Sequence, residues 1–134
     1  MHYFLTQKIY DRLFENGREQ QELSARGEFK YHVPAVLLFL AGTEFKWLLT
    51  EINPDLTDEA FGLCDLGMGF PEMGYVSLTE LGELRSPFGL KVERDITFET
   101  DKNLEYFVDL ANKHSRIVLS DDNKPLPPNL DNSR

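Results

Sequence analysis

The sequence predicts an α+β domain in which a central antiparallel sheet of four to five strands is flanked by an N-terminal and a C-terminal helix. Near both ends of the chain, apolar residues recur every three or four positions, which is the spacing of an amphipathic helix. Between residues 33 and 98, short apolar or alternating runs are separated by turns rich in Gly, Pro and Asn, a pattern typical of antiparallel strands. Hydrophobic residues make up 41% of the 134 positions, which is enough for one core.

The first predicted helix begins after Thr6, because threonine is a good N-cap residue. Gly17 is its predicted C-terminal stop. Residues 18–30 are polar and charged, and they either extend the helix or form an exposed loop. The apolar side chains that define the buried face of this helix are Ile9, Tyr10, Leu13 and Phe14.

Five segments are predicted to be strands. The first is almost wholly apolar, so we expect it to be buried on both faces, and a Gly-Thr turn joins it to the second strand as a hairpin. The last alternates apolar and polar residues, which is typical of a strand with one buried face. The predicted strands are 33–41, 45–52, 60–66, 72–78 and 90–98.

Two more helices complete the predicted fold. Ser77 is the predicted N-cap of a short helix over residues 78–84. Asp101 or Asn103 caps a final helix, whose apolar face consists of Leu104, Phe107, Val108 and Ala111.

The chain after the final helix is expected to contribute little to the core. Residues 115–119 are predicted to return as a short strand. Residues 120–134 hold three prolines and few apolar side chains, so we predict a flexible tail. The predicted organisation is therefore one domain over residues 1–119 followed by this tail.

The charge balance excludes some kinds of partner. The chain has 23 acidic and 14 basic side chains, which give a net charge of −9. It lacks the cluster of Lys and Arg that binding to a phosphate backbone requires, so direct nucleic-acid binding is not expected. The longest apolar run, residues 33–42, is well short of the roughly 20 residues that span a bilayer, so no membrane segment is expected.

Cysteine and histidine usage argues against a thiol, zinc or triad site. Cys64 is the single cysteine, which excludes an intramolecular disulfide, favours a cytoplasmic location and fits a place in the core. His2, His32 and His114 are far apart in the sequence, so a histidine-based site is not expected. No C-x-x-C or H-E-x-x-H spacing is present, and no cofactor is predicted.

Four motifs between residues 47 and 98 resemble, in the same order, those of a known family. They are WLLTE at 47–51, FGLCDLG at 61–67, EMGYVSLTEL at 72–81 and FGLKVERDITF at 88–98. Together they are similar to the bacterial family called domain of unknown function 2958, which consists of small proteins often met on plasmids and other mobile elements. The resemblance covers about residues 1–119. Because the family has no established activity, the resemblance implies a class of protein and not a reaction.

The polar residues of these motifs lie at predicted strand ends or beside turns, where a sheet could bring them together. The candidate ligand- or partner-binding residues are Glu51, Asp65, Glu72, Arg94 and Asp95. Three interpretations stay open. Arg94 neutralises one or two carboxylates as a structural ion pair, or the group forms a pocket for an anion or another ligand. In the third, the carboxylates bind Mg²⁺ or Ca²⁺ or act as acid and base.

Arg94 lies mid-strand, on the face that Val92 and Ile96 give to the core. A guanidinium stays charged there, so it requires carboxylate partners or a route to solvent. Asp65 and Glu72 are its expected partners, because strands 60–66 and 72–78 are the expected neighbours in a meander.

Four aromatic residues stand close to glycines: Phe61, Phe70, Tyr75 and Phe88. We expect them to be core residues, with the glycines allowing close backbone approach. The alternative is an exposed aromatic platform.

The function that these observations favour is a small accessory protein of a mobile element that binds a protein partner without catalysis. Its predicted binding surface is the loop Gly67–Pro71 with the carboxylates around it. One alternative is a carboxylate-based hydrolase that uses Asp65, Glu72 and Asp95. Another is an acidic antagonist that mimics DNA towards a host defence protein.

Overall fold

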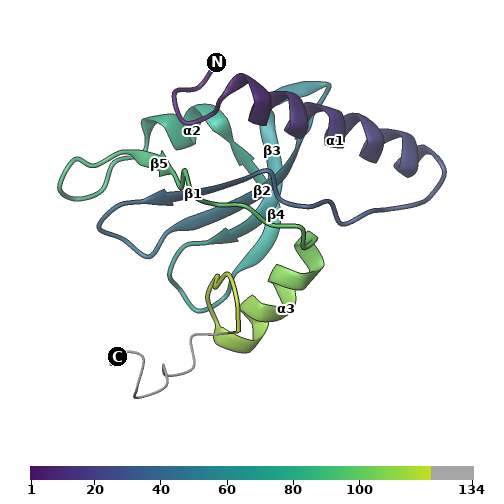
Figure 1. The fold of residues 1–134 in the computed structure, drawn as a ribbon. Coiled ribbons are helices and arrows are strands. Elements are labelled where there is room, and N and C mark those ends of the chain that lie inside the picture. The colour runs from purple at the N-terminus through teal and green to yellow at the C-terminus, as the bar shows by residue number, and fades with distance from the viewer. Residues whose placement is uncertain (122–134) are drawn as a thin grey trace.

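The computed structural model describes residues 1–121 and confirms the α+β class. All five strands pair antiparallel in one sheet of order β4-β3-β2-β1-β5, with helices at both ends of the chain (Figure 1). The elements are α1 (Gln7–Ala25), β1 (Val36–Leu40), β2 (Lys46–Asn53), β3 (Leu56–Asp65), β4 (Glu72–Ser77), α2 (Leu78–Glu83), β5 (Val92–Arg94) and α3 (Leu104–His114).

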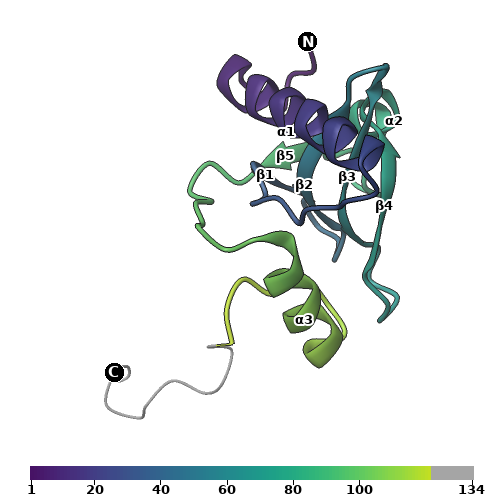
Figure 2. The ribbon, with the colours of Figure 1, turned by 90° about the vertical axis from the view of Figure 1, so that its right-hand side faces the viewer.

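The sheet has a separate apolar core on each face. Leu38 of β1 packs with Leu13 of α1 on one face, whereas its neighbour Leu37 packs with Phe107 of α3 on the other. Adjacent residues of a strand point to opposite faces, so the two helices cover opposite sides of the sheet. Figure 2 shows α1 and α3 placed in this way. Because both faces are covered, β1 and β2 are almost completely buried, and for β1 this agrees with its almost wholly apolar sequence.

Helix α1 is longer than predicted, because Gly17 does not end it. Thr6 caps the helix as expected, and its hydroxyl accepts from the Ile9 N–H at 3.1 Å. Gly17 instead lies where α1 crosses the end of β2, and a Cβ built there would overlap the backbone oxygen of Ile52. The glycine is therefore required for close helix–sheet contact, and residues 18–25 continue the helix.

Strand β5 is shorter than predicted and lies on an unexpected side of the sheet. It pairs with β1, at the edge opposite to β4, because α2 and the turn at Ser86 carry the chain across. Only residues 92–94 of the predicted strand 90–98 join the sheet. Residues 115–119 form no strand.

The cap at Ser77 and the final helix match the prediction. The Ser77 hydroxyl accepts from the Glu80 N–H at 3.1 Å, and Asn103 caps α3 by accepting from the Tyr106 N–H at 3.0 Å.

The chain after α3 is described up to Asp121. The Asp121 carboxylate accepts from Lys113 Nζ at 2.6 Å and from His114 Nε2 at 2.9 Å, so this residue is held against α3. The predicted flexible tail, residues 120–134, otherwise lies outside the described residues. Over residues 1–121, no helix combines the length and the apolar character needed to cross a bilayer.

Candidate functional site

The structure does not bring the five candidate residues together. Glu51 lies within β2, Asp65 ends β3 and Glu72 begins β4, whereas Arg94 ends β5 and Asp95 follows it. Strands β1 and β2 separate β5 from β3, so the expected convergence is wrong. In particular, Asp65, Glu72 and Asp95 do not form the carboxylate set that a hydrolase of the predicted kind requires. Over residues 1–121, no group of three His, Cys, Asp or Glu side chains is arranged to hold a metal ion.

The expected pairing of Arg94 with Asp65 and Glu72 is also wrong. Arg94 lies opposite Leu38 in the β5–β1 ladder and is half-buried. The prediction failed because it assumed a simple meander, whereas β5 joins the far edge of the sheet.

Asp95 closes a turn after β5. One of its carboxylate oxygens accepts from the Thr97 hydroxyl at 2.7 Å and from the Thr97 N–H at 2.9 Å. These two hydrogen bonds hold the pKa of Asp95 below its usual value. The side-chain hydrogen bonds of Asp95 are therefore local to this turn.

Asp65 is a buried structural acceptor. Its side chain receives one hydrogen bond from the Gly67 N–H at 2.9 Å and another from the Ile117 N–H at 2.8 Å. Both carboxylate oxygens are used, so the carboxylate connects the end of β3 to the chain that follows α3. This contact holds Ile117, which is itself buried, in the core beneath α3.

Cys64 and Glu72 face each other across the β3–β4 ladder. Burial, together with the nearby charge of Glu72, raises the pKa of the Cys64 thiol to about 11. A thiol with this pKa is protonated at neutral pH and is a poor nucleophile. The prediction that Cys64 is structural agrees with this environment.

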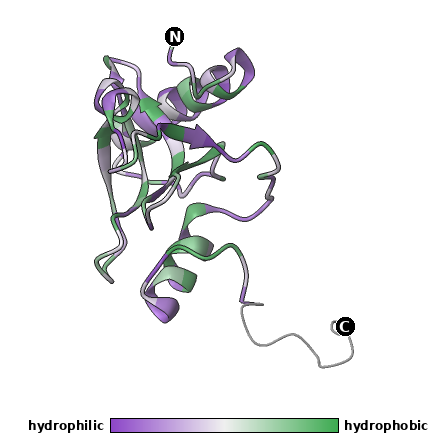
Figure 3. Ribbon diagram, turned by 90° about the vertical axis from the view of Figure 1, so that its left-hand side faces the viewer, coloured by the Kyte–Doolittle hydropathy of each residue, from purple (hydrophilic) through white to green (hydrophobic). Residues whose placement is uncertain are grey.

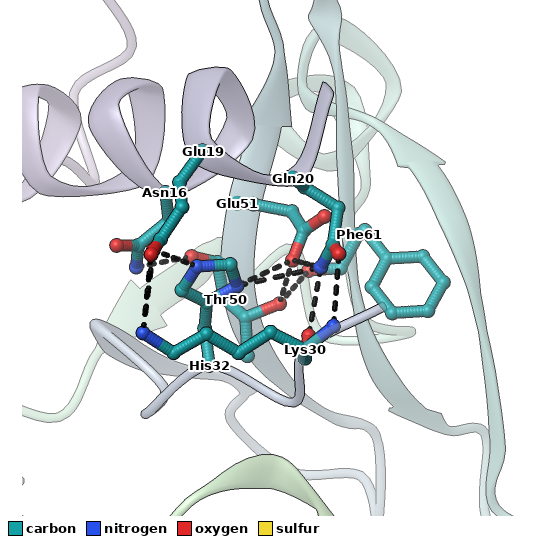
Figure 4. A network of polar contacts seen from close by, with 8 residues as sticks. All are labelled: Asn16, Glu19, Gln20, Lys30, His32, Thr50, Glu51 and Phe61. Atoms are coloured by element: carbon teal, nitrogen blue, oxygen red, sulfur yellow. Dashed lines mark hydrogen bonds and ion pairs between the residues drawn. The ribbon is translucent and has the colours of Figure 1, made fainter. Parts of the chain in front are cut away.

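Glu51 belongs to a buried polar network between α1 and the sheet (Figure 4). Its side chain is only 7% exposed. One carboxylate oxygen, Oε1, lies 3.1 Å from the Thr50 hydroxyl, 3.4 Å from Gln20 Nε2 and 3.4 Å from His32 Nδ1. Three donors thus converge on one oxygen, which is how a carboxylate is stabilised away from water.

His32 connects Glu51 to Glu19 on α1. Its Nε2 lies 2.7 Å from Glu19 Oε1, while its Nδ1 faces Glu51. Burial alone would lower the pKa of His32, but its hydrogen bonds to Glu51 and Glu19 outweigh burial and raise the pKa. The pKa of Glu19 is correspondingly lowered, first by its hydrogen bond to His32 and then by that to Lys30. The protonated imidazole donates to both carboxylates.

Gln20 fixes the chain that carries His32. Its side-chain amide pairs with the backbone of Lys30: Nε2 donates to the Lys30 carbonyl at 2.7 Å, and Oε1 accepts from the Lys30 N–H at 3.0 Å. On the other side, the His32 carbonyl accepts from the N–H of Leu104, the first residue of α3. The network therefore holds α1, β2 and α3 in one arrangement, which is a structural role.

Sequence reasoning found Glu51 but missed its partners Gln20 and His32. A signal for Gln20 was present, because Leu13, Gly17 and Gln20 share one face of a helix that continues past Gly17. For His32 the signal was weaker, since it is a histidine directly before an apolar strand. Neither residue lies in the motif block.

The hairpin between β3 and β4 exposes apolar side chains at its tip. Met68 is 75% exposed and Phe70 is 80% exposed, and Leu66 is about half exposed. Figure 3 shows the hydrophobic colour at this tip, which extends away from the rest of the sheet. The side chains of Cys64, Leu66, Met68, Phe70 and Glu72 line a cleft of about 320 Å³ at the base of the hairpin.

The expectation that the glycine-adjacent aromatics are core residues is wrong for three of the four. Phe70, Tyr75 and Phe88 are all exposed, and only Phe61 packs against a core. Phe61 and Tyr75 form an edge-to-face pair on the β3–β4 ladder, with ring centroids 5.2 Å apart. Phe70 and Tyr75 of the β3–β4 hairpin thus face solvent, in the direction of the alternative interpretation, whereas Phe61 of the same hairpin does not.

Comparison with known proteins identifies the family. The family model described as "Protein of unknown function (DUF2958)" matches residues 4–118, which include every described helix and strand. The chain belongs to the DUF2958 family. The match confirms the family that the four sequence motifs indicated. Neither the comparison with curated proteins nor that with solved structures finds a match.

Proposed function

We propose that this DUF2958 protein is a non-catalytic binding protein that contacts a protein partner through the tip of the β3–β4 hairpin, residues 66–70. The observation that carries the proposal is the exposure of Met68 and Phe70 side by side on one loop. Large apolar side chains in water are unfavourable, and grouped exposure of this kind is typical of interaction surfaces. Aromatic residues and methionine are enriched in protein interfaces.

The backbone around the tip also supports binding. Gly67 and Gly69 both have positive φ values, which let the loop present its side chains in a turn that other residues rarely adopt. Strand β4 beside it is an edge strand, so its outer N–H and C=O groups face no neighbouring strand. A partner could therefore add a strand to this edge while its apolar surface covers the tip.

The charge near the tip indicates what kind of partner fits. Glu72 is exposed at the base of the hairpin, and the Glu44 side chain lies beside Gly67. A suitable partner presents an apolar surface with a basic rim. The proposal also includes the function predicted from the sequence, that of an accessory protein of a mobile element.

The proposal is tested by site-specific photo-crosslinking in host cells. A photoreactive phenylalanine analogue replaces Phe70 in one variant and Phe88 in another, since both residues are more than 75% exposed but lie on different loops. We expect a defined protein to be crosslinked from position 70 and not from position 88. Adding Met68→Ser to the position-70 variant should abolish this product without changing the melting temperature, because Met68 packs against little.

Two results would contradict the proposal. In the first, positions 70 and 88 give the same set of crosslinked proteins, which would mean that the tip has no specific partner. In the second, the position-70 product persists unchanged with Met68→Ser and also with Leu66→Ser.

A further inference from the structure

A second cleft lies on the α1 side of the molecule, at the edge of the sheet opposite to the β3–β4 hairpin. The first turns of α1, the chain entering β1 and the chain around β5 enclose about 300 Å³. This volume is at the lower end of the range for small-molecule sites. The side chains that matter for its chemistry are Lys8, Ile9, Arg12, Pro34, Arg94 and Phe98.

Three of these side chains are cationic, and none of the three forms an ion pair with a described residue. Within residues 1–121, Lys8, Arg12 and Arg94 make no ion pair and no side-chain hydrogen bond. By contrast, the other basic side chains of α1 and its C-cap, Arg18 and Arg26, each bond a glutamate. Three unpaired cations in one cleft repel one another. They are grouped here although the chain as a whole is acidic, with a net charge of −9.

The position of these groups favours an anion. Lys8 and Arg12 are one helical turn apart, so they share a face of α1, and Arg94 reaches the cleft from β5. The N-terminus of α1 contributes to the same cleft through Thr6, and its first turn contains no acidic residue, so the helix dipole adds positive potential. Glu99 is the one carboxylate among the lining residues of this described cleft.

The rest of the lining is apolar. Ile9, Pro34, Ala35 and Phe98 provide a hydrophobic surface beside the charged groups. A ligand that uses the whole cleft therefore carries a strongly anionic group on an apolar or aromatic body. A phosphate monoester, with a charge of about −1.5 to −2 at neutral pH, balances three cations better than a single carboxylate does. The planar guanidinium groups of Arg12 and Arg94 suit bidentate contact with phosphate oxygens.

We propose that this cleft binds a small organic phosphate, with the phosphate between Lys8, Arg12 and Arg94 and the apolar part against Phe98 and Pro34. The site lies at the β5 edge and the hairpin tip at the β4 edge, so either proposal can fail without the other.

The test is a titration of the full chain with phenyl phosphate, followed by ¹H–¹⁵N NMR at low salt. We expect saturable shifts confined to residues around positions 6–12, 34–35 and 94–100, and weaker binding of inorganic phosphate, which lacks the aromatic body. Arg94→Gln and Arg12→Gln should each weaken phenyl phosphate binding by about tenfold or more, because each removes a charge-assisted contact. Arg18→Gln is the matched control, since Arg18 lies on α1 but is paired with Glu15. It should bind as the wild type does.

Other outcomes overturn the proposal. Absence of saturable shifts excludes the site, and equal weakening by Arg18→Gln and Arg12→Gln shows that only net charge matters. Arg12 is exposed, so Arg12→Gln remains a valid test even if Arg94→Gln alters the fold. If single-stranded oligonucleotides bind the same residues more tightly as their length increases, the cleft contacts a nucleic-acid backbone and the small-ligand proposal is wrong.

Discussion

The buried network around Glu51 allows a quantitative prediction for Glu51→Ala. The substitution removes the acceptor of three donors and leaves His32, whose side chain is 3% exposed, with Glu19 as its remaining carboxylate partner. Removing one member of a buried ion pair costs about 3–5 kcal/mol. Because Glu19 still bonds His32, we expect a loss near the lower end, about 3 kcal/mol.

The more conservative Glu51→Gln separates charge from hydrogen bonding. Its amide oxygen can still accept from Thr50 and Gln20, so the loss is limited to the charge-assisted part, about 1–2 kcal/mol. Glu15→Ala is the control, because it removes an exposed ion pair with Arg18 on α1, and such pairs contribute less than about 1 kcal/mol.

Urea unfolding at pH 6, which is below the raised pKa of His32, measures these free energies of unfolding. For a domain of this size, 3 kcal/mol corresponds to a drop of roughly 10 °C in Tm. A double-mutant cycle of Glu51→Ala with His32→Ala should give a coupling energy well above 0.5 kcal/mol. If Glu51→Ala stays within about 1 kcal/mol of the wild type, or the two losses simply add, the network does not stabilise the fold and our reasoning is wrong.

Three further predictions follow from the structure. His32 has a pKa raised above 6.5 in the folded state, so the stability that its protonation contributes is complete below pH 6.5 and is lost as the pH rises through the folded pKa. The free energy of unfolding should therefore decline between pH 6 and pH 8, and His32→Gln should flatten this decline. Gly17→Ala should destabilise the protein by about 1–3 kcal/mol, because the added Cβ overlaps the backbone of Ile52 and this outweighs the higher helix propensity of alanine. Gly74→Ala is the control: its Cβ meets no atom within 4 Å, so it should be near neutral in thermal melts. Asp65→Ala should speed amide hydrogen exchange at Ile117; unchanged exchange there would show that the carboxylate does not hold this segment.

Much of the fold could be predicted from the sequence because the relevant interactions are local. The Thr6 and Ser77 caps each act on an N–H three residues away, so the chain near the cap suffices to specify them. The β1–β2 hairpin likewise depends on two adjacent apolar runs and a short turn. The four motifs that indicated the family were also sufficient, because the family match confirms them.

The arrangement of the site was decided only by tertiary structure. The local sequence does not specify which edge of the sheet β5 joins. Because β5 pairs with β1, Arg94 lies far from Asp65 in the sheet and lines the same cleft as Arg12 of α1. In the same way, Gln20 meets Glu51 because α1 packs on β2, and His32 meets Glu51 because the chain before β1 runs beside β2; periodicity encodes neither contact. Backbone periodicity reports which face of an element is buried. Which polar groups share that buried space depends on how distant elements pack, and this is the physical reason that the network and the basic cleft emerged from the structure alone.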